Sequence, residues 1–241
     1  MTKLLISTPA FDGKVNGSYA ISLAETFALL LSQGIETRIG IRHSGSLLMS
    51  ERNAILKDFL AGDYTHLMCI DADIAWQANS VLQLISYDQD FVGACYPARG
   101  ADAFFLRPEF DGDGNMIETS QHLLRMKAIP AGFMLLSRRL VEVMCRHFAH
   151  LYYTPKDVDA LENGTQIGRS GYALFNCELI DGEFWGEDYV FCLRAREAGF
   201  SVLVDPRIEL NHAGIQMSLQ SVIDVEKKPI VMEREYATQE R

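Results

Sequence analysis

The stretch HLMCIDADIAW, residues 66–76, carries an apolar run directly into two aspartates, Asp71 and Asp73. The run that ends at Ile70 has the length and the apolar character of a buried strand. Two carboxylates at the end of such a strand repel each other and lose solvation, so we expect a cation to offset them. The stretch therefore predicts a strand that ends at a charged functional site.

Strand-like and helix-like segments alternate on both sides of this stretch. The predicted strands occupy residues 3–8, 35–41, 65–70, 90–97, 129–137 and 201–205. The predicted helices occupy residues 18–34, 50–63, 79–87, 138–153 and 186–199. Because strands that alternate with helices imply a parallel sheet, residues 1–217 are predicted to form one α/β domain with a mostly parallel central sheet flanked by helices.

Three local features refine this pattern. Ser50 is the expected N-cap of the second helix. The sequence FDGDGNMI, residues 110–117, predicts a hairpin turn between short strands. Residues 218–241 are expected to form a charged C-terminal tail that is partly disordered.

The composition restricts the class of protein. At 241 residues and 48% hydrophobic side chains, the chain is long enough for one sizeable core. A net charge of −10 argues against nucleic acid or an anionic membrane as partner, since both attract clustered Lys and Arg. The five cysteines contain no CxxC pair, and no apolar run approaches the roughly 20 residues of a membrane span. These features predict a soluble, cytoplasmic protein.

Context distinguishes the aspartate pair from similar triplets elsewhere in the chain. The spacing DxD also occurs at residues 88–90, 111–113 and 157–159. Only Asp71 and Asp73 directly follow a clear apolar strand, and ligands of parallel α/β sheets bind beyond the carboxyl ends of the strands. Their oxygens suit Mg²⁺ or Mn²⁺, which bridge carboxylates to substrate phosphates. The alternative is that both are solvated carboxylates of a surface loop.

Two further positions are candidates for chemistry. Glu187 and Asp188 begin a predicted helix after the run GEFWG, and an ionised Asp188 could act as a general base toward a hydroxyl. A helix N-terminus favours the ionised carboxylate, so the pKa of Asp188 is predicted to be low. His212, in IELNHAG, follows a short strand and is either a metal ligand or a structural residue.

Taken together, the segments resemble the GT-A glycosyltransferases, in particular the family 2-like group. The resemblance rests on STPAFDGKVNGSYAISLA, SERNAILKDFL, HLMCIDADIAW, FVGACYPAR, IPAGFMLLSRRLVE, WGEDYVFCLRAREAGF and NHAG, in the family's order over roughly residues 3 to 214. It implies a single GT-A, Rossmann-like domain with a small antiparallel addition. It also implies an enzyme that moves a sugar from a nucleoside-diphosphate sugar, of UDP or GDP type, to an acceptor hydroxyl with inversion.

The resemblance assigns metal and catalytic roles residue by residue. By match to the family's motifs, Asp71 lies toward the ribose and the metal, and Asp73 binds the Mn²⁺ or Mg²⁺ ion directly. His212 matches a position that often completes the metal site. Asp188 matches the catalytic base of inverting members, and Glu187 beside it positions the acceptor or the base.

The same match assigns the nucleotide side of the site. Thr8, Pro9 and Asp12 border the nucleotide base, and Arg52 lies near the nucleotide, with a solvated residue of the first helical turn as the alternative for Arg52. Gly132 and Phe133 resemble the sequence that shapes the donor-sugar and acceptor pocket, although AGFMLL is also ordinary strand core.

Two segments of the chain are the expected source of acceptor specificity. Residues 98–128 and 150–182 fit none of the shared motifs, and acceptor specificity is expected there. The expected acceptor is a glycan, a lipid-linked glycan or another hydroxyl compound.

Three other functions are weighed against this one. A haloacid-dehalogenase-type phosphatase also has two aspartates after a strand, but it usually has Thr or Val where this chain has Ala75. A nucleotidyltransferase would usually carry a glycine-rich basic loop, where this chain has only Lys14. A non-catalytic nucleotide-sugar-binding module stays open.

Overall fold

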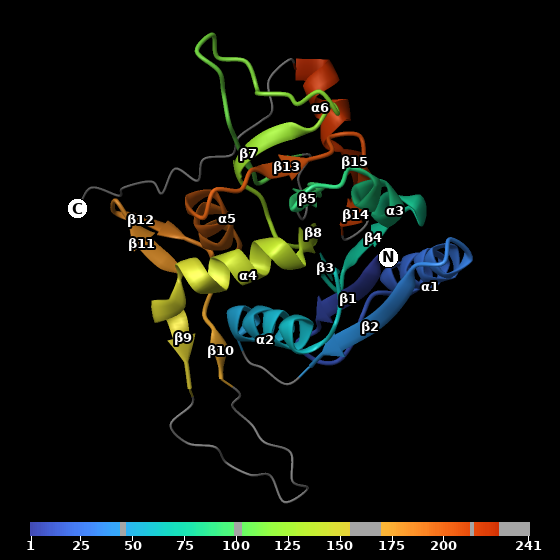
Figure 1. Ribbon diagram of the computed structural model, residues 1–241. Helices are drawn as coiled ribbons and strands as arrows, with labels where there is room; N and C mark the ends of the chain where they lie inside the picture. The colour runs from blue at the N-terminus through green and yellow to red at the C-terminus, as the bar shows by residue number, and fades with distance from the viewer. Residues whose placement is uncertain (44–46, 99–102, 155–169, 213–214, 227–241) are drawn as a thin grey trace, which may run out of the picture.

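The protein is built around one eight-stranded sheet with helices on both faces (Figure 1). The structure is a computed structural model that describes residues 1–43, 47–98, 103–154, 170–212 and 215–226. In spatial order the strands are β2 (Glu36–Arg42), β1 (Lys3–Pro9), β3 (His66–Ile70), β8 (Phe133–Ser137), β5 (Phe91–Gly93), β13 (Val202–Val204), β7 (Leu124–Ala128) and β6 (Arg107–Pro108). The helices are α1 (Gly17–Ser32), α2 (Leu48–Ala61), α3 (Asn79–Ser86), α4 (Arg138–His147), α5 (Glu187–Glu197) and α6 (Leu219–Glu226).

The direction of the strands confirms a mostly parallel sheet and adds two reversals. β1 runs parallel to β2 and β3, and β13 runs parallel to β5. β8 lies antiparallel between β3 and β5, and β7 lies antiparallel between β13 and β6. β8 and β7 are therefore the two strands that run against the common direction of the sheet.

The smaller sheets form the antiparallel addition. β4 (Ile74–Trp76), β14 (Glu209–His212) and β15 (Ile215–Ser218) make a three-stranded antiparallel sheet. Two hairpins complete the fold, one from β9 (Tyr152–Tyr153) and β10 (Gly171–Tyr172), the other from β11 (Glu178–Ile180) and β12 (Glu183–Trp185).

Both faces of the central sheet are buried, as the continuous apolar strands predict. Leu4 and Ile6 of β1 belong to one buried cluster with Tyr19 of α1, whereas Leu5 belongs to the opposite cluster with Phe59 of α2. Alternate residues of a strand point to opposite faces, so the single run KLLIST supplies both cores. Each fully buried apolar side chain contributes roughly 1.5–3 kcal/mol.

Three helix ends differ from the sequence-based expectation or extend it. Ser50 is not an N-cap, because α2 begins two residues earlier, after Leu47. α4 ends at His147, where a 3-10 turn (Ala149–Leu151) replaces the predicted continuation. α5 begins after Gly186 as predicted, and Gly199 just beyond its end has φ +92°, a conformation that favours glycine.

The expected C-terminal tail begins with a helix. Leu219 and Val222 of α6 are buried in the same cluster as α2 and α4, because their three-residue spacing puts them on one face. Residues 227–241 lie outside the described part of the chain. None of the helices within the described ranges is both long enough and apolar enough to cross a bilayer.

Candidate functional site

The site lies where β3 ends, and strand register gathers its residues there. β8 starts opposite the end of β3, so that the backbone N–H of Asp71 donates to the Gly132 carbonyl at 3.0 Å. The chain then turns into β4, whose Ile74 pairs with His212 of β14. This pairing brings His212, far away in sequence, beside Asp73. The resulting set of side chains around Asp71, Asp73, Asp188 and Arg52 is called the acidic centre below.

Asp73 and His212 form one half of the acidic centre. His212 Nε2 lies 3.4 Å from an oxygen of Asp73. His212 Nδ1 is 2.7 Å from the Pro97 carbonyl oxygen, which can only accept, so Nδ1 carries the proton. Nε2 is therefore the ring nitrogen that faces the Asp73 carboxylate. An imidazole that donates its other N–H to a backbone carbonyl is the usual arrangement of a metal-binding histidine.

Arg52 provides the cation that the aspartate pair requires. Its Nη2 donates to both oxygens of Asp71, at 2.9 and 3.2 Å, and its Nη1 lies 3.4 Å from the Ala131 carbonyl. Arg52 is only 4% exposed, so it is not the solvated residue that the alternative interpretation described. A guanidinium that contacts both carboxylate oxygens fixes the orientation of Asp71.

The same guanidinium connects the aspartate pair to α5. Arg52 Nε lies 3.4 Å from Glu187 Oε1, at the first residue of the helix. Burial opposes the charge of Arg52, yet the nearby carboxylates, with Asp71 the strongest, hold its pKa above the usual range. The buried cation thus stays charged and joins two acidic segments that are 116 residues apart, from Asp71 to Glu187.

Asp188 is partly buried at the start of α5 and accepts the backbone N–H of Tyr189 at 2.8 Å. Burial, together with the neighbouring charge of Glu187, raises the pKa of Asp188 to about 6. The low pKa predicted from the helix N-terminus is therefore wrong, because desolvation outweighs the macrodipole and the charge of Arg52. A carboxylate with such a pKa is ionised at pH 7 and basic enough to take up a proton.

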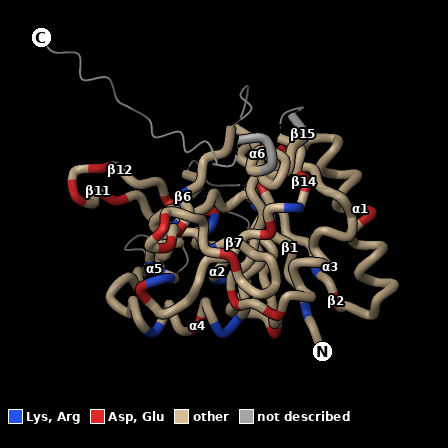
Figure 2. The backbone as a smooth tube through the Cα atoms, turned by 90° about the horizontal axis from the view of Figure 1, so that it is seen from above, with Lys and Arg blue, Asp and Glu red and all other residues tan. Residues whose placement is uncertain are grey.

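The hairpin β11–β12 leads into the start of α5 and is joined to the body both at its base and beside its turn. Figures 1 and 2 both show it projecting from the molecule, and Figure 2 shows Asp and Glu along it. Ion pairs join Glu183 to Arg107 and Glu178 to Arg194. Arg194 of α5 also donates to two backbone carbonyls of the preceding loop, both at 2.7 Å. These contacts join the hairpin and the loop before it to β6 and to the last turn of α5.

Tyr96 and Gly132 complete the centre, and sequence reasoning did not single out Tyr96. The Tyr96 hydroxyl lies 3.4 Å from an Asp71 oxygen, and its ring packs edge-on against His212 with centroids 5.0 Å apart. A Cβ at Gly132 would lie 2.5 Å from the Tyr96 ring and 2.7 Å from Asp71. Gly132 is therefore required for space. The available signal for Tyr96 was its position near the end of the predicted strand 90–97.

Other predicted site residues lie at or beside this edge of the sheet. Thr8 is fully buried, with its hydroxyl 2.5 Å from that of Tyr19, and Pro9 is also buried. Asp12 is exposed and paired with Lys14. The loop that contains Asp12 reaches the aspartate pair through the N–H of Asn16, which donates to the Ala72 carbonyl at 2.9 Å. Contact of these residues with a nucleotide stays a prediction.

Two residues of the AGFMLL and SERN segments have structural partners. Phe133 is fully buried and packs on Trp76, which agrees with the strand-core interpretation. Asn53 donates its side-chain amide to the Phe175 carbonyl at 2.7 Å and accepts the Phe175 N–H at 2.8 Å. Asn53 thus anchors the segment that precedes β11.

The donor set fits a divalent cation only in part. Within the described ranges, no three His, Cys, Asp or Glu side chains are arranged to hold a metal ion. Asp73 and His212 offer one oxygen and one nitrogen, which suits a cation that takes its other ligands from substrate phosphates and water. The role of Asp71 as a metal ligand stays a prediction, because Arg52 already occupies both its oxygens.

Comparison with known proteins gives a fold likeness. No protein-family model matches the sequence, and no curated protein is similar to it in sequence. The crystal structure of A197 from STIV matches with a TM-score of 0.50 and 14% identity over 91% of both chains. GalNAc-T7, solved with UDP, GalNAc and Mn²⁺, matches at 0.45 and 13%, over 93% of this chain and 48% of that chain, about half its length.

A second solved glycosyltransferase is also similar. A mutant of Drosophila β1,4-galactosyltransferase 7, solved with manganese, UDP-Gal and xylobiose, matches at a TM-score of 0.44 and 17% identity, over 100% of this chain and 81% of that chain. At these identities the likeness concerns the fold alone. The chain has the mixed α/β fold that its sequence predicts.

Proposed function

We propose that the chain is a metal-dependent glycosyltransferase that moves a sugar from a nucleoside-diphosphate sugar to an acceptor hydroxyl with inversion. The observation that carries this proposal is the double contact of Arg52. Asp71, two residues before the candidate metal ligand Asp73, and Glu187, directly before the candidate base Asp188, contact the same buried guanidinium. The same cation thus contacts both the segment that we propose holds the metal and the segment that we propose holds the base.

Asp188 performs the proton transfer in this proposal. Its carboxylate takes the proton of the acceptor hydroxyl as the oxygen attacks the anomeric carbon, while the bond to the nucleoside diphosphate breaks on the opposite side. The pKa of about 6 supports this role, because a base works best when its pKa lies near the working pH. Glu187, in contact with Arg52, positions the acceptor or the base.

Asp73 and His212 would hold the divalent cation, Mn²⁺ or Mg²⁺. When bound, the cation supplies positive charge that stabilises the departing diphosphate. His212 donates Nδ1–H to Pro97, which directs Nε2 toward Asp73, and Tyr96 packs edge-on against the ring. Asp71 would lie toward the ribose, and the loop from Thr8 to Asp12 would border the base of a UDP- or GDP-type donor.

Turnover tests the assignment of the base. The wild-type protein is incubated with Mn²⁺ and a panel of UDP- and GDP-sugars, with simple glycans as acceptors, and release of nucleoside diphosphate is measured. Asp188→Asn is expected to reduce turnover by about 100- to 10,000-fold while nucleotide binding is retained. Wild-type turnover is expected to fall as the pH is lowered through about 6, because the base becomes protonated.

Asp181→Asn is the matched control. Asp181 lies in the turn of the preceding hairpin with φ +51°, a conformation that Asn also adopts, so turnover is expected to be unchanged. Full activity in Asp188→Asn would contradict the assignment. Metal-dependent nucleotide-sugar binding without any release or transfer would instead identify a non-catalytic binding module.

A further inference from the structure

The two edges of the central sheet are built differently. At one edge, β6 has two residues, one of which is Pro108, and its pairing with β7 contains a register shift. A short strand, a proline and an irregular register all protect an edge from pairing with another chain. At the other edge, β2 pairs with β1 through seven residues in continuous register and contains no proline. The edge formed by β2 therefore lacks these protective features.

The backbone of β2 presents hydrogen-bonding groups outward. The N–H of Ala10 donates to the Arg42 carbonyl at 2.8 Å, so the backbone groups of Arg42 point toward β1. The backbone groups of successive strand residues point to opposite sides, so those of Thr37, Ile39 and Ile41 point away from β1. Within the described ranges, no strand pairs with this side of β2, which Figure 1 shows at the margin of the sheet. The side chains of Ile39 and Ile41 are 37% and 41% exposed.

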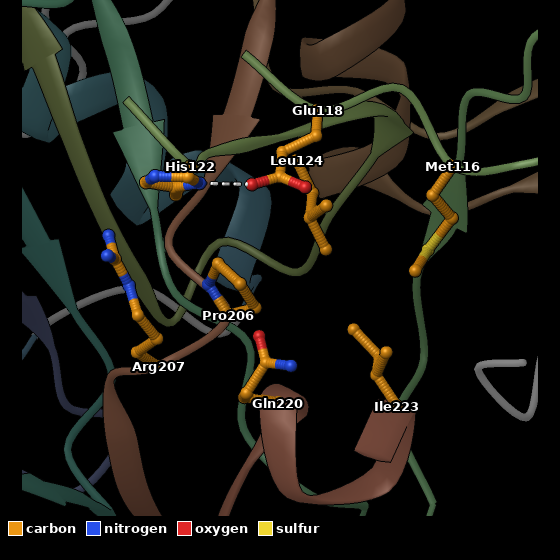
Figure 3. A pocket seen from close by; sticks show the side chains of 8 residues that line it. All are labelled: Met116, Glu118, His122, Leu124, Pro206, Arg207, Gln220 and Ile223. Atoms are coloured by element: carbon orange, nitrogen blue, oxygen red, sulfur yellow. Dashed lines mark hydrogen bonds and ion pairs between the residues drawn. The ribbon is translucent and has the colours of Figure 1, made fainter. Parts of the chain in front are cut away.

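The pocket drawn in Figure 3 differs from this edge in its polar groups. It has a volume of about 360 Å³ and lies between the segment before β7, the turn after β13, and α6. Glu118 of its lining pairs with His122. Arg207 pairs with Asp205 and also donates to the Tyr87 hydroxyl. The charged groups of the pocket thus have partners within the chain, whereas the outward backbone groups of β2 are available to a further strand.

A second copy of β2 fits this edge in one register. In an antiparallel pair with two-fold symmetry, the residue at the axis lies opposite itself. An axis at Ile39 pairs all seven residues of β2 and sets Arg38 opposite Gly40, which has no side chain. An axis at Arg38 would set two copies of Arg38 opposite each other, and an axis at Gly40 would set Arg38 opposite Arg42. Like charges directly opposite each other are destabilising, so the axis at Ile39 is favoured.

The same axis also matches the outward backbone groups. Ile39 lies opposite Ile39 and Thr37 lies opposite Ile41, so each outward residue of one copy meets an outward residue of the other. Opposite residues of this kind exchange two N–H···O bonds. Glu36 then lies opposite Arg42, although each already has an ion-pair partner within its own chain. Backbone hydrogen bonds and the exposed isoleucines therefore supply the attraction.

We propose that two copies of this chain pair through β2 in antiparallel register, about a two-fold axis at Ile39. The two central sheets then form one continuous sheet across the interface. This is strand addition to an open sheet edge, in which backbone hydrogen bonds supply the affinity and the side chains set the register. The pairing is independent of sugar transfer and needs neither metal nor nucleotide.

Sedimentation equilibrium of the full chain, without metal or nucleotide, tests the proposal. The wild type is expected to have the mass of two chains at micromolar concentration. Ile39→Lys is expected to have the mass of one chain, because two ammonium groups would face each other at the axis. Ile21→Lys, at a 62% exposed position of α1, is the matched control and is expected to remain a dimer.

A mixture of two variants tests the position of the axis. Ile39→Lys and Ile39→Glu are each expected to be monomeric, because like charges meet at the axis. Their equimolar mixture is expected to form a dimer, because Lys then faces Glu. A mixture that stays monomeric would overturn the register, since only an axis at Ile39 places the two substituted positions directly opposite each other.

A second position covers the case in which the Ile39 variants do not fold, as judged by circular dichroism. The N–H of Thr37 points away from β1, so Thr37→Pro removes no ladder bond from the monomer. The dimer loses one donor in each copy, and its dissociation constant is expected to rise at least roughly tenfold. The proposal is overturned by a monomeric wild type, by equal masses of Ile39→Lys and Ile21→Lys, or by an unchanged dissociation constant in Thr37→Pro.

Discussion

Asp71 and Asp73 end a buried strand, whereas Asp111 and Asp113 have the same spacing in an exposed turn. Both oxygens of Asp71 accept from the buried Arg52. Asp111 accepts instead from backbone N–H groups of its own turn, those of Asp113 and Asn115, both at 2.9 Å. The first triplet is held by residues far away in the sequence, and the second holds only its own turn.

In the two regions, the pKa of a carboxyl group is shifted in opposite directions. Backbone N–H groups, with that of Asn115 foremost, lower the pKa of the exposed Asp111. In the acidic centre, burial and Glu187 raise the pKa of Asp188. Folding therefore stabilises the charged form of Asp111 in the turn. It disfavours the charged form of Asp188, so that an ionised Asp188 lowers the stability of the folded protein. Such destabilised charge is typical of functional sites.

The largest expected effect is that of removing the shared cation. Arg52→Met leaves the half-buried carboxylates of Asp71 and Glu187 without their partner, and the free energy of unfolding is expected to fall by about 3–5 kcal/mol. Urea denaturation measures this. Arg139→Met is the control, because Arg139 pairs at the surface with Asp90 of another DxD triplet, and this variant is expected to lose much less stability. Equal losses in the two variants would show that the contacts of Arg52 contribute no more to stability than a surface ion pair does.

A smaller effect with a distinctive pH dependence is expected at Asp188. Its pKa is about 6 in the folded protein, against the ordinary aspartate pKa of 3.8, so stability is lost as the pH rises from about 4 to about 6. Asp188→Asn removes this penalty and is expected to stabilise the protein at pH 7.5 by up to about 3 kcal/mol. The gain should vanish at pH 4, as measured by thermal unfolding.

In the same experiment, Asp111→Asn is expected to change the stability in the opposite direction. The lowered pKa of Asp111 means that its contribution to stability is present above pH 4 and lost as the pH falls below that value. The variant is therefore expected to be slightly less stable than the wild type at pH 7.5. A destabilised Asp188→Asn at pH 7.5 would refute the assigned environment of Asp188.

The smallest expected effect is that of adding a methyl group at Gly132, where little space is available. Gly132→Ala would force a Cβ against Tyr96 and Asp71, with an expected loss of about 1–3 kcal/mol in unfolding free energy. Gly112, between the two turn aspartates, has no atom within 4 Å of a Cβ, and Gly112→Ala is expected to change stability by no more than about 0.5 kcal/mol. If the two alanine variants unfold at the same urea concentration, the close packing at Gly132 is refuted.

The sequence determined the local parts of this structure. The bounds of β1 and β3 follow from continuous apolar runs, and Gly186 and Gly199 mark the ends of α5. The reversed direction of β8 depends on which end of the sheet the chain re-enters, and no local pattern records that choice.

The candidate site could be predicted in its residue types but not in its pairings. Asp71, Asp73, Asp188 and His212 were found from their positions after strands or at a helix start. The contacts of Arg52 join α2 to β3 and α5, and such long-range contacts leave no spacing in the sequence. The raised pKa of Asp188 has the same origin, since distant segments bury it.

Calorimetric titration with UDP, GDP, CDP and dTDP, with and without Mn²⁺, tests the central claim most directly. The wild type, Asp73→Ala and Asp113→Ala are compared. We predict Mn²⁺-dependent binding of one nucleotide that is lost in Asp73→Ala and retained in Asp113→Ala. Binding that ignores Mn²⁺, equal behaviour of the two variants, or no binding of any nucleotide to the wild type would contradict the account.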